Sequence, residues 1–167
     1  PSKRAPCWRS RWCDMFNDPV VTAPSPVIAV CMPIADQVSA ATMRSIMALD
    51  IPKPYHLLDR TGVPVEHARN HIVGRVLFDP ALADVTHLLW VDDDMTFAPD
   101  ALRRLLAHGL PIVGGLCHGR RAPHYSPILA YRRAGDLAGY AFRHDYPLGL
   151  VEVDATGGAF ILVERRV

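Results

Sequence analysis

The chain has 167 residues, of which 50% are apolar and 21% are charged, and its formal net charge is only +1. This length suits one domain with a hydrophobic core, and the composition excludes a globally disordered chain. The near-zero net charge gives no strong nucleic-acid signal, and no window of the sequence is apolar for long enough to span a membrane.

Residues 1–26 are expected to form a basic, Pro-rich and poorly ordered arm. The sequence begins without an initiator Met or an apolar signal core, so we expect no secretory address and a numbering that opens inside a larger reading frame. The four cysteines do not form a C-x-x-C or zinc-finger spacing, which favours a cytoplasmic location. A zinc site or a disulfide at Cys7 and Cys13 remains an alternative.

Strand and helix patterns alternate through the first two-thirds of the sequence. Strands are predicted at residues 27–31, 55–58, 86–91 and 111–116, and helices at residues 39–49, 65–78 and 98–109. The period then changes, and further strands without helices are predicted at residues 127–131, 150–153 and 159–163. We therefore expect residues 27–167 to form an α/β fold, a three-layer α/β/α Rossmann-like sheet that is mostly parallel with an antiparallel extension.

Three consecutive carboxylates, Asp92, Asp93 and Asp94, follow the predicted strand at residues 86–91. A buried strand that stops in acidic residues delivers them to the carboxyl edge of an α/β sheet, where such folds bind ligands. Because side chains alternate along an extended backbone, Asp92 and Asp94 are expected to point one way and Asp93 the other. Mg²⁺ and Mn²⁺ typically take one or two carboxylates, with water and phosphate on their other sites. We predict metal ligands at Asp92 and Asp94, with a solvated acidic turn as the alternative.

The loop after residues 111–116 holds four further candidates. Arg120 and Arg121 could reach a phosphate group through their planar guanidinium groups, although a solvated basic turn is the slightly favoured interpretation. His118 and His124 are candidates for a metal or phosphate contact, since imidazole is a common ligand. For each histidine an ordinary loop position remains the preferred alternative.

Two glycine pairs, at residues 114–115 and 157–158, lie at the edges of predicted strands. The absence of a Cβ there lets a ligand or another backbone approach closely, and a simple turn or bulge is the alternative. Asp154 precedes the second pair and is expected to face the same cleft. A carboxylate in that place is a candidate general base for an acceptor hydroxyl.

In this order, four features resemble the A-type glycosyltransferases: the strand at residues 27–33, the helix with Arg69 and Asn70, residues 88–94 with their D-x-D pattern, and residues 154–160 with their Thr-Gly-Gly segment. The chain is most similar to the large family two, over roughly residues 27–167. The most specific part of the resemblance is the order of all the elements together.

The resemblance implies a metal-dependent glycosyltransferase that moves a sugar from a UDP- or GDP-sugar to an unknown acceptor, with Mn²⁺ or Mg²⁺ holding the diphosphate. Carried over by position, Asp94 is the direct metal ligand, and Asp92 lies near the ribose or the water shell of the metal. The residues implied to contact the nucleotide sugar are Pro33, Arg69, Asn70, Asp92, Asp93, Gly157 and Gly158.

One departure from the family pattern concerns the catalytic base. Family two enzymes commonly carry a Glu-Asp pair after the Thr-Gly-Gly strand, and this sequence ends at Val167 before such a pair. Either the base lies in a C-terminal portion that this sequence does not include, which we favour, or a residue such as Asp154 or Asp145 takes its place. A non-catalytic nucleotide-sugar-binding module is the main alternative. A nucleotidyltransferase is less favoured, since residues 32–36 lack the Gly-rich basic loop of that class.

Overall fold

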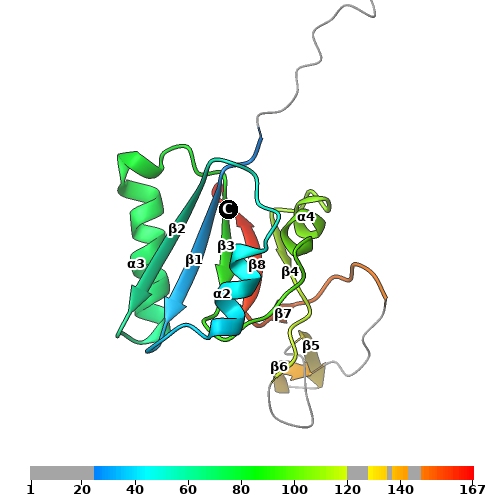
Figure 1. Cartoon of the computed structure of the whole chain (residues 1–167). Coiled ribbons are helices and arrows are strands. Elements are labelled where there is room, and N and C mark those ends of the chain that lie inside the picture. Colours follow the sequence, from blue (N-terminus) through cyan, green and yellow to red (C-terminus); the bar gives the residue numbers. More distant parts are fainter. Residues whose placement is uncertain (1–24, 120–127, 135–136, 143–147) are drawn as a thin grey trace, which may run out of the picture.

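The computed structural model describes residues 25–119, 128–134, 137–142 and 148–167 (Figure 1). These residues form three α-helices, one 3₁₀ helix and eight strands. The helices are α2 (Ala40–Met47), α3 (Val65–Phe78), η1 (Pro80–Leu82) and α4 (Ala101–Leu106). The strands are β1 (Ile28–Ile34), β2 (Tyr55–Thr61), β3 (His87–Val91), β4 (Ile112–Gly114), β5 (Ile128–Ala134), β6 (Leu137–Phe142), β7 (Ala155–Thr156) and β8 (Phe160–Glu164).

The main sheet has five strands in the order β2-β1-β3-β8-β4. Strand β1 runs parallel to both β2 and β3, whereas β8 runs antiparallel to both β3 and β4. Because β8 opposes its two neighbours, β4 runs in the same direction as β1 and β3. The carboxyl ends of β1, β3 and β4 therefore share one edge of the sheet.

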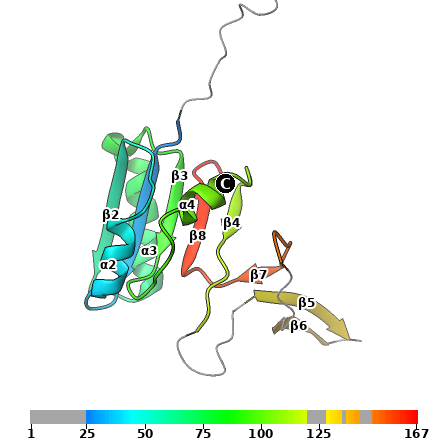
Figure 2. The ribbon, with the colours of Figure 1, turned by 45° about the vertical axis from the view of Figure 1, so that its right-hand side comes forward.

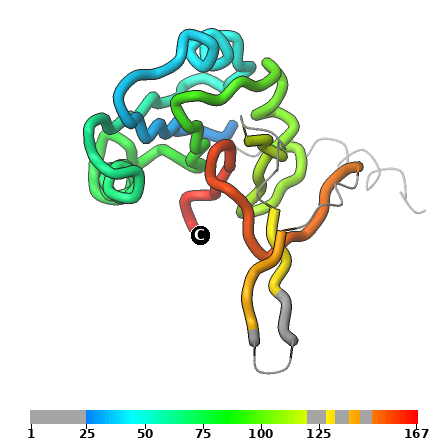
Figure 3. The backbone as a smooth tube through the Cα atoms, turned by 90° about the horizontal axis from the view of Figure 1, so that it is seen from below, coloured from blue at the N-terminus to red at the C-terminus, as the bar shows by residue number. Residues whose placement is uncertain are grey.

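The second sheet is small and antiparallel, with its three strands in the order β6-β5-β7. Strands β5 and β6 form a hairpin in which Tyr131 pairs with Tyr140, and β7 pairs with the start of β5. Figures 2 and 3 show this hairpin extending away from the main sheet. Cross-strand aromatic pairs of this kind stabilise antiparallel ribbons.

The prediction of a mostly parallel, three-layer α/β/α Rossmann-like sheet was wrong. The described chain is strand-rich and mixed, and two of the four pairings in its main sheet are antiparallel. The physical reason is β8, whose apolar residues Phe160 and Leu162 are buried when the strand inserts between β3 and β4. Strands β5, β6 and β7 form a sheet of their own and do not extend the first one.

Two further strand predictions were wrong within that second sheet. Residues 150–153 are not a strand, and β6 forms where the sequence indicated a loop. The sequence of β6, Leu-Ala-Gly-Tyr-Ala-Phe, mixes large residues with Gly139 and Ala141 and shows no alternation of apolar and polar residues. The strand forms because its backbone pairs with β5, and its own sequence gives little indication of that pairing.

The continuous apolar run of β1 is explained by burial on both faces of the sheet. Ile28, Val30 and Met32 lie in one core with residues of β3, α4 and β8. Ala29 and Cys31 lie in a second core with Ile72, Val76, Trp90 and other residues of α3 and β3. Helix α3 thus packs on one side of β1, and the core containing α4 lies on the other.

The helices follow the predicted positions more closely than the strands do. Ser39 caps α2, as predicted, and its side chain accepts a hydrogen bond from the Thr42 amide. Helix α4 is shorter than the expected segment at residues 98–109. No helix in the described part of the chain is long and apolar enough to cross a membrane.

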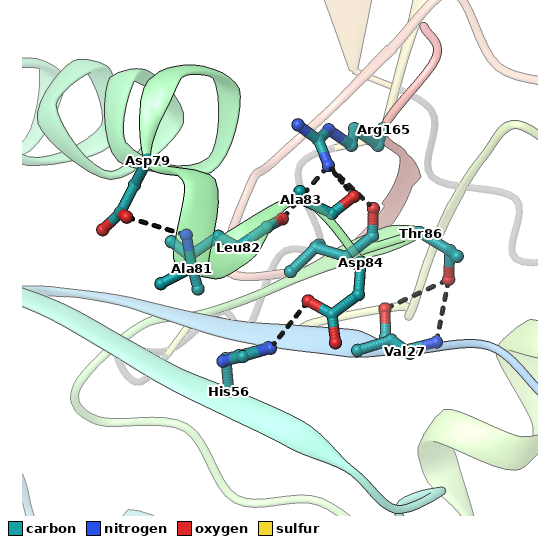
Figure 4. Close-up of polar contacts among 10 residues, drawn as sticks. Val27, His56, Asp79, Ala81, Leu82, Ala83, Asp84, Thr86 and Arg165 are labelled. Carbon is teal, nitrogen blue, oxygen red and sulfur yellow. Dashed lines mark hydrogen bonds and ion pairs between the residues drawn. The ribbon is translucent and has the colours of Figure 1, made fainter.

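At the opposite edge of the sheet from the carboxyl ends, Arg165 holds the segment that leads into β3 (Figure 4). Its Nη1 atom donates to the carbonyl oxygens of Leu82 at 3.1 Å, Ala83 at 2.7 Å and Val85 at 3.4 Å. These carbonyls belong to the last residue of η1 and to the turn that follows it. Arg165 therefore fixes the entry to the strand that carries the three carboxylates.

We predict that Arg165→Ala lowers the free energy of unfolding by about 1–2 kcal/mol, because the carbonyls that accept from this charged side chain all lose their donor. Chemical denaturation measures the change. Arg166→Ala is the matched control, since that side chain is 80% exposed and forms an ion pair with Glu164. Its expected effect is below about 0.5 kcal/mol. Equal effects of the two substitutions would contradict the role given to Arg165.

Candidate functional site

The three carboxylates after β3 line a cleft of about 560 Å³ at the shared carboxyl edge of the main sheet. The end of β1 and the loop between β2 and α3 form the other walls. Pro33 is buried at the end of β1, and Gly62 adopts a φ of 75° in the turn after β2. The full lining is Pro33, Ile34, Ala35, Gly62, Val63, Pro64, Val65, Ala68, Asp92, Asp93 and Asp94.

The backbone of the acidic segment is a turn and not an extension of β3. Strand β3 ends at Val91, Asp93 and Asp94 lie in a turn, and the Met95 amide donates to the Asp92 carbonyl at 3.4 Å. The expected alternation of the three side chains requires an extended backbone, and that expectation was wrong. All three aspartates line the same cleft.

Asp93 connects the acidic turn to the segment between β1 and α2. Its Oδ2 atom accepts a hydrogen bond from the Ala35 amide at 2.9 Å. Its carbonyl oxygen accepts from the Ser39 amide at 2.9 Å and from Thr42 Oγ1 at 3.0 Å. Asp93 therefore positions the loop that forms one wall of the cleft and the first turn of α2.

Arg69 of α3 reaches across to the same edge of the sheet. Its Nη2 atom lies 3.0 Å from Asp92 Oδ1 and also donates to the Gly158 carbonyl at 3.0 Å. The guanidinium carbon lies 5.5 Å from the centroid of the Trp90 ring, within the range of a cation–π contact. The buried Nε atom of Arg69 has no hydrogen-bond partner. One side chain thus links α3, β3 and the turn before β8.

Gly158 leaves room for Arg69, whose guanidinium occupies the space of a Cβ. A Cβ atom built at position 158 would overlap Arg69 Nη1 and lie 3.1 Å from Arg69 Cζ. The sequence predicted the approach of a ligand or another backbone at this glycine, whereas the group that lies there is the Arg69 side chain. Gly157 is half-buried and does not line the cleft.

Negative charge exceeds positive charge at the acidic turn. Partial burial raises the pKa of Asp92, the Arg69 guanidinium opposes that rise, and the neighbouring Asp94 and Asp93 carboxylates add to it. Burial also raises the pKa of the Cys117 thiol, and Asp92 contributes to the rise. One guanidinium beside three carboxylates leaves a site that favours a cation.

Not every predicted site residue comes to the cleft. Asn70 is exposed on α3 and does not line it. Asp154 lies next to β7, where its Oδ2 atom accepts from the Tyr131 amide at 2.8 Å, and it is also outside the cleft lining. His118 is exposed, and it does not line the cleft. The positions that lie outside the described residues are Arg120, Arg121, His124, Asp145, Cys7, Cys13 and residues 1–24 of the arm.

Sequence reasoning missed the loop at residues 62–65 and Trp90. The loop forms a wall of the cleft, and Trp90 lies beneath Arg69. Gly62, four residues after the predicted strand at residues 55–58, was a usable signal, because glycine marks turns that need a positive φ. No local signal in the sequence pairs Trp90 with an arginine from another element.

The carboxylate oxygens at the cleft suit a divalent cation that is bound partly by the protein and partly by a ligand. Within the described ranges, no group of three or more His, Cys, Asp or Glu side chains is arranged to hold a metal ion. Mg²⁺ and Mn²⁺ are nevertheless often held by one or two carboxylates, with phosphate and water completing the shell. Asp94 and the second oxygen of Asp92 are carboxylate donors of this kind, and the Oδ2 atom of Asp93 accepts from the Ala35 amide.

Comparisons with known proteins bear on the fold. No family model and no curated protein matches the sequence. Among solved structures, the crystal structure titled A197 from STIV is similar, with a TM-score of 0.50 and 17% sequence identity. The alignment covers 84% of this chain and 65% of that chain, so the present chain spans less than two-thirds of A197. At this identity the likeness shows the fold alone.

We predict that Gly158→Ala destabilises the protein only while Arg69 is present. In the wild-type background the new methyl group displaces the guanidinium from Asp92, whereas in an Arg69→Ala background the space is empty. A double-mutant cycle measured by chemical denaturation should give a coupling of roughly 1–2 kcal/mol. The fluorescence of Trp90 should change with Gly158→Ala as well, since Arg69 contacts its ring. Additive effects would show that the two residues do not interact.

Proposed function

We propose that the chain is a metal-dependent glycosyltransferase domain that binds a UDP- or GDP-sugar in the cleft at the end of β3. The observation that supports the proposal is the meeting of three carboxylates and one guanidinium at the edge of a cleft of about 560 Å³. A cleft of this size falls within the range of small-molecule sites. The family resemblance of the sequence supplies the class of reaction.

The two walls of the cleft suit the two halves of a nucleoside diphosphate. Asp92 and Asp94 form the acidic wall, where a cation and a diphosphate would lie. Val63, Pro64 and Val65 form an apolar wall beside it, which suits the face of a nucleobase. A bound Mn²⁺ or Mg²⁺ supplies Lewis-acid chemistry by neutralising charge on the diphosphate leaving group.

The residues of the chain have separate tasks in this proposal. Asp94 and Asp92 hold the cation, and Arg69 orients the Asp92 carboxylate through the hydrogen bond at 3.0 Å. Asp93 keeps the β1–α2 loop in place beside the cleft through the Ala35 amide. Arg69 and Asp93 are therefore positioning residues.

The proposed reaction exchanges one bond at the anomeric carbon of the sugar. An acceptor oxygen forms a bond to that carbon, the bond from the carbon to the phosphate oxygen breaks, and the nucleoside diphosphate leaves with the electron pair. The proton of the acceptor passes to a base. Asp154 stays a predicted base. Its carboxylate accepts from the Tyr131 amide and lies outside the residues that line the cleft.

We propose a cytoplasmic location for this activity. Cys31 and Cys117 are both free thiols in the described part of the chain. Reduced thiols are the usual state of cysteine in the cytosol. The location stays an inference from composition together with these two residues.

We predict that UDP or GDP binds in a Mn²⁺-dependent manner, and that Asp94→Asn weakens this binding at least tenfold. Removing a directly coordinating carboxylate takes away one of the few protein ligands of the cation. Asp93→Asn is the matched control, since an asparagine oxygen can still accept from the Ala35 amide. We expect a change below about threefold for that variant, because the remaining effect is only the loss of one nearby charge.

Calorimetric titration of UDP and of GDP, each with and without Mn²⁺, measures these affinities. Far-UV circular dichroism of each variant shows that the fold is retained. Identical affinities with and without Mn²⁺ in the wild-type protein would refute the proposed cation site. An equal loss in Asp93→Asn and Asp94→Asn would refute the separate tasks given to the two residues.

A non-catalytic nucleotide-sugar-binding module is the second candidate, and the placement of Asp154 outside the cleft lining favours it. We predict slow release of UDP from a UDP-sugar in the presence of Mn²⁺ if the chain is an enzyme, because water can replace an absent acceptor. Release is followed with a coupled assay for UDP. Mn²⁺-dependent binding without any release above the Asp94→Asn background would assign the chain to the binding class.

A further inference from the structure

A second cavity, of about 590 Å³, lies between β4 and the segment at residues 148–156. Its lining is aliphatic and includes Ile112, Leu116, Ile128, Leu150 and Val153. Ile112 is 52% exposed and Leu150 is 57% exposed, so large apolar side chains here face solvent. Glu152 is the one charged residue of this lining, and no lining residue is aromatic. Pockets of this size and composition are typical of sites for apolar ligand groups.

The aliphatic pocket runs along β4, and its Gly115 and Leu116 end reaches the same carboxyl edge of the sheet as the acidic cleft. The Asp92 amide donates to the Ala159 carbonyl at 3.0 Å, and the Gly115 amide donates to the Phe160 carbonyl at 2.9 Å. Asp92 and Gly115 thus lie on opposite sides of the start of β8. Two strand spacings separate β3 from β4, which places the pocket roughly 10 Å from the acidic turn.

We propose that the aliphatic pocket binds an alkyl chain carried by the sugar acceptor. The inference rests on the proposed function, because it assigns the second half of the same reaction. A lining with one carboxylate and no cationic residue is unsuited to a nucleoside diphosphate, which leaves the donor to the acidic cleft. The absence of aromatic rings from the lining favours an alkyl chain over a planar aromatic group, which would find no ring to stack on.

Gly114 provides a position from which the pocket can be filled. A Cβ atom at this residue would lie 3.7 Å from Ile161 Cγ1 and 3.7 Å from Thr156 Cγ2, and both of these residues line the pocket. These are ordinary van der Waals distances, so Gly114→Ala fits without displacement. A longer side chain in Gly114→Leu extends from the same point into the space proposed for the ligand.

The test uses methyl, butyl, hexyl and octyl β-glucosides as probes, each below its micelle concentration, titrated calorimetrically into the full chain. Burial of a methylene group strengthens binding up to about fourfold. We expect the octyl compound to bind at least tenfold more tightly than the methyl compound. Phenyl β-glucoside is expected to bind more weakly than hexyl β-glucoside. Affinities that do not depend on chain length would overturn the proposal.

Two pairs of variants locate the binding site. Gly114→Leu should remove the gain with chain length, whereas Gly114→Ala should keep it. Ile112→Thr, which retains a β-branched side chain in β4, should reduce the octyl affinity at least threefold. Leu77→Gln is its control, since Leu77 is 50% exposed on α3 and outside the pocket lining. An equal loss in Leu77→Gln would show unspecific surface binding and overturn the proposal.

Titration of UDP with Mn²⁺ into the same samples separates this inference from the proposed function. Mn²⁺-dependent UDP binding with a flat alkyl series overturns the alkyl pocket and leaves the donor site standing. A rising alkyl series without UDP binding overturns the glycosyltransferase proposal, and with it the acceptor role of the pocket. Asp94→Asn should weaken UDP binding and leave the alkyl series unchanged, which supports two separate sites.

Discussion

The ion pair between Arg69 and Asp92 is the interaction on which the acidic edge of the sheet depends. A half-buried guanidinium needs partners for its charge, and Arg69 finds them in the Asp92 carboxylate, the Gly158 carbonyl and the face of Trp90. These partners come from β3 and from the turn before β8. The helix that carries Arg69 packs on β1 and β2 through Ile72 and Val76. A contact made at one side chain therefore fixes the relative positions of the elements around the cleft.

Three neighbouring aspartates have three different environments, although the sequence presents them as one run. Asp92 pairs with a guanidinium, Asp93 accepts from a backbone amide, and Asp94 borders both the cleft and a smaller cavity at the start of α2. Their surroundings differ because the turn after Val91 directs each side chain to a different neighbour. Three identical residues in a row thus acquire three different sets of contacts.

Sequence patterns predicted those parts of the fold that short-range chemistry specifies. The apolar run of β1, the Ser39 cap of α2 and the acidic end of β3 follow from neighbouring residues, and all three are present. The position of β8 between β3 and β4, the β5–β6 hairpin and the contact of Arg69 with Gly158 depend on residues far apart in the sequence. No periodicity encodes such pairings, and a mostly parallel sheet was wrongly inferred for this reason.

The place of β8 in the main sheet has a consequence for the order in which the protein is made. This strand is the last of those in the described residues, yet it joins β3 to β4, and the turn before it contacts Arg69 and Asp92. A ribosome must therefore release residues up to about position 164 before the sheet can close and the cleft can acquire its final shape. Until then, β3 and β4 each lack the neighbour that β8 provides, and their backbone groups on that side stay unpaired.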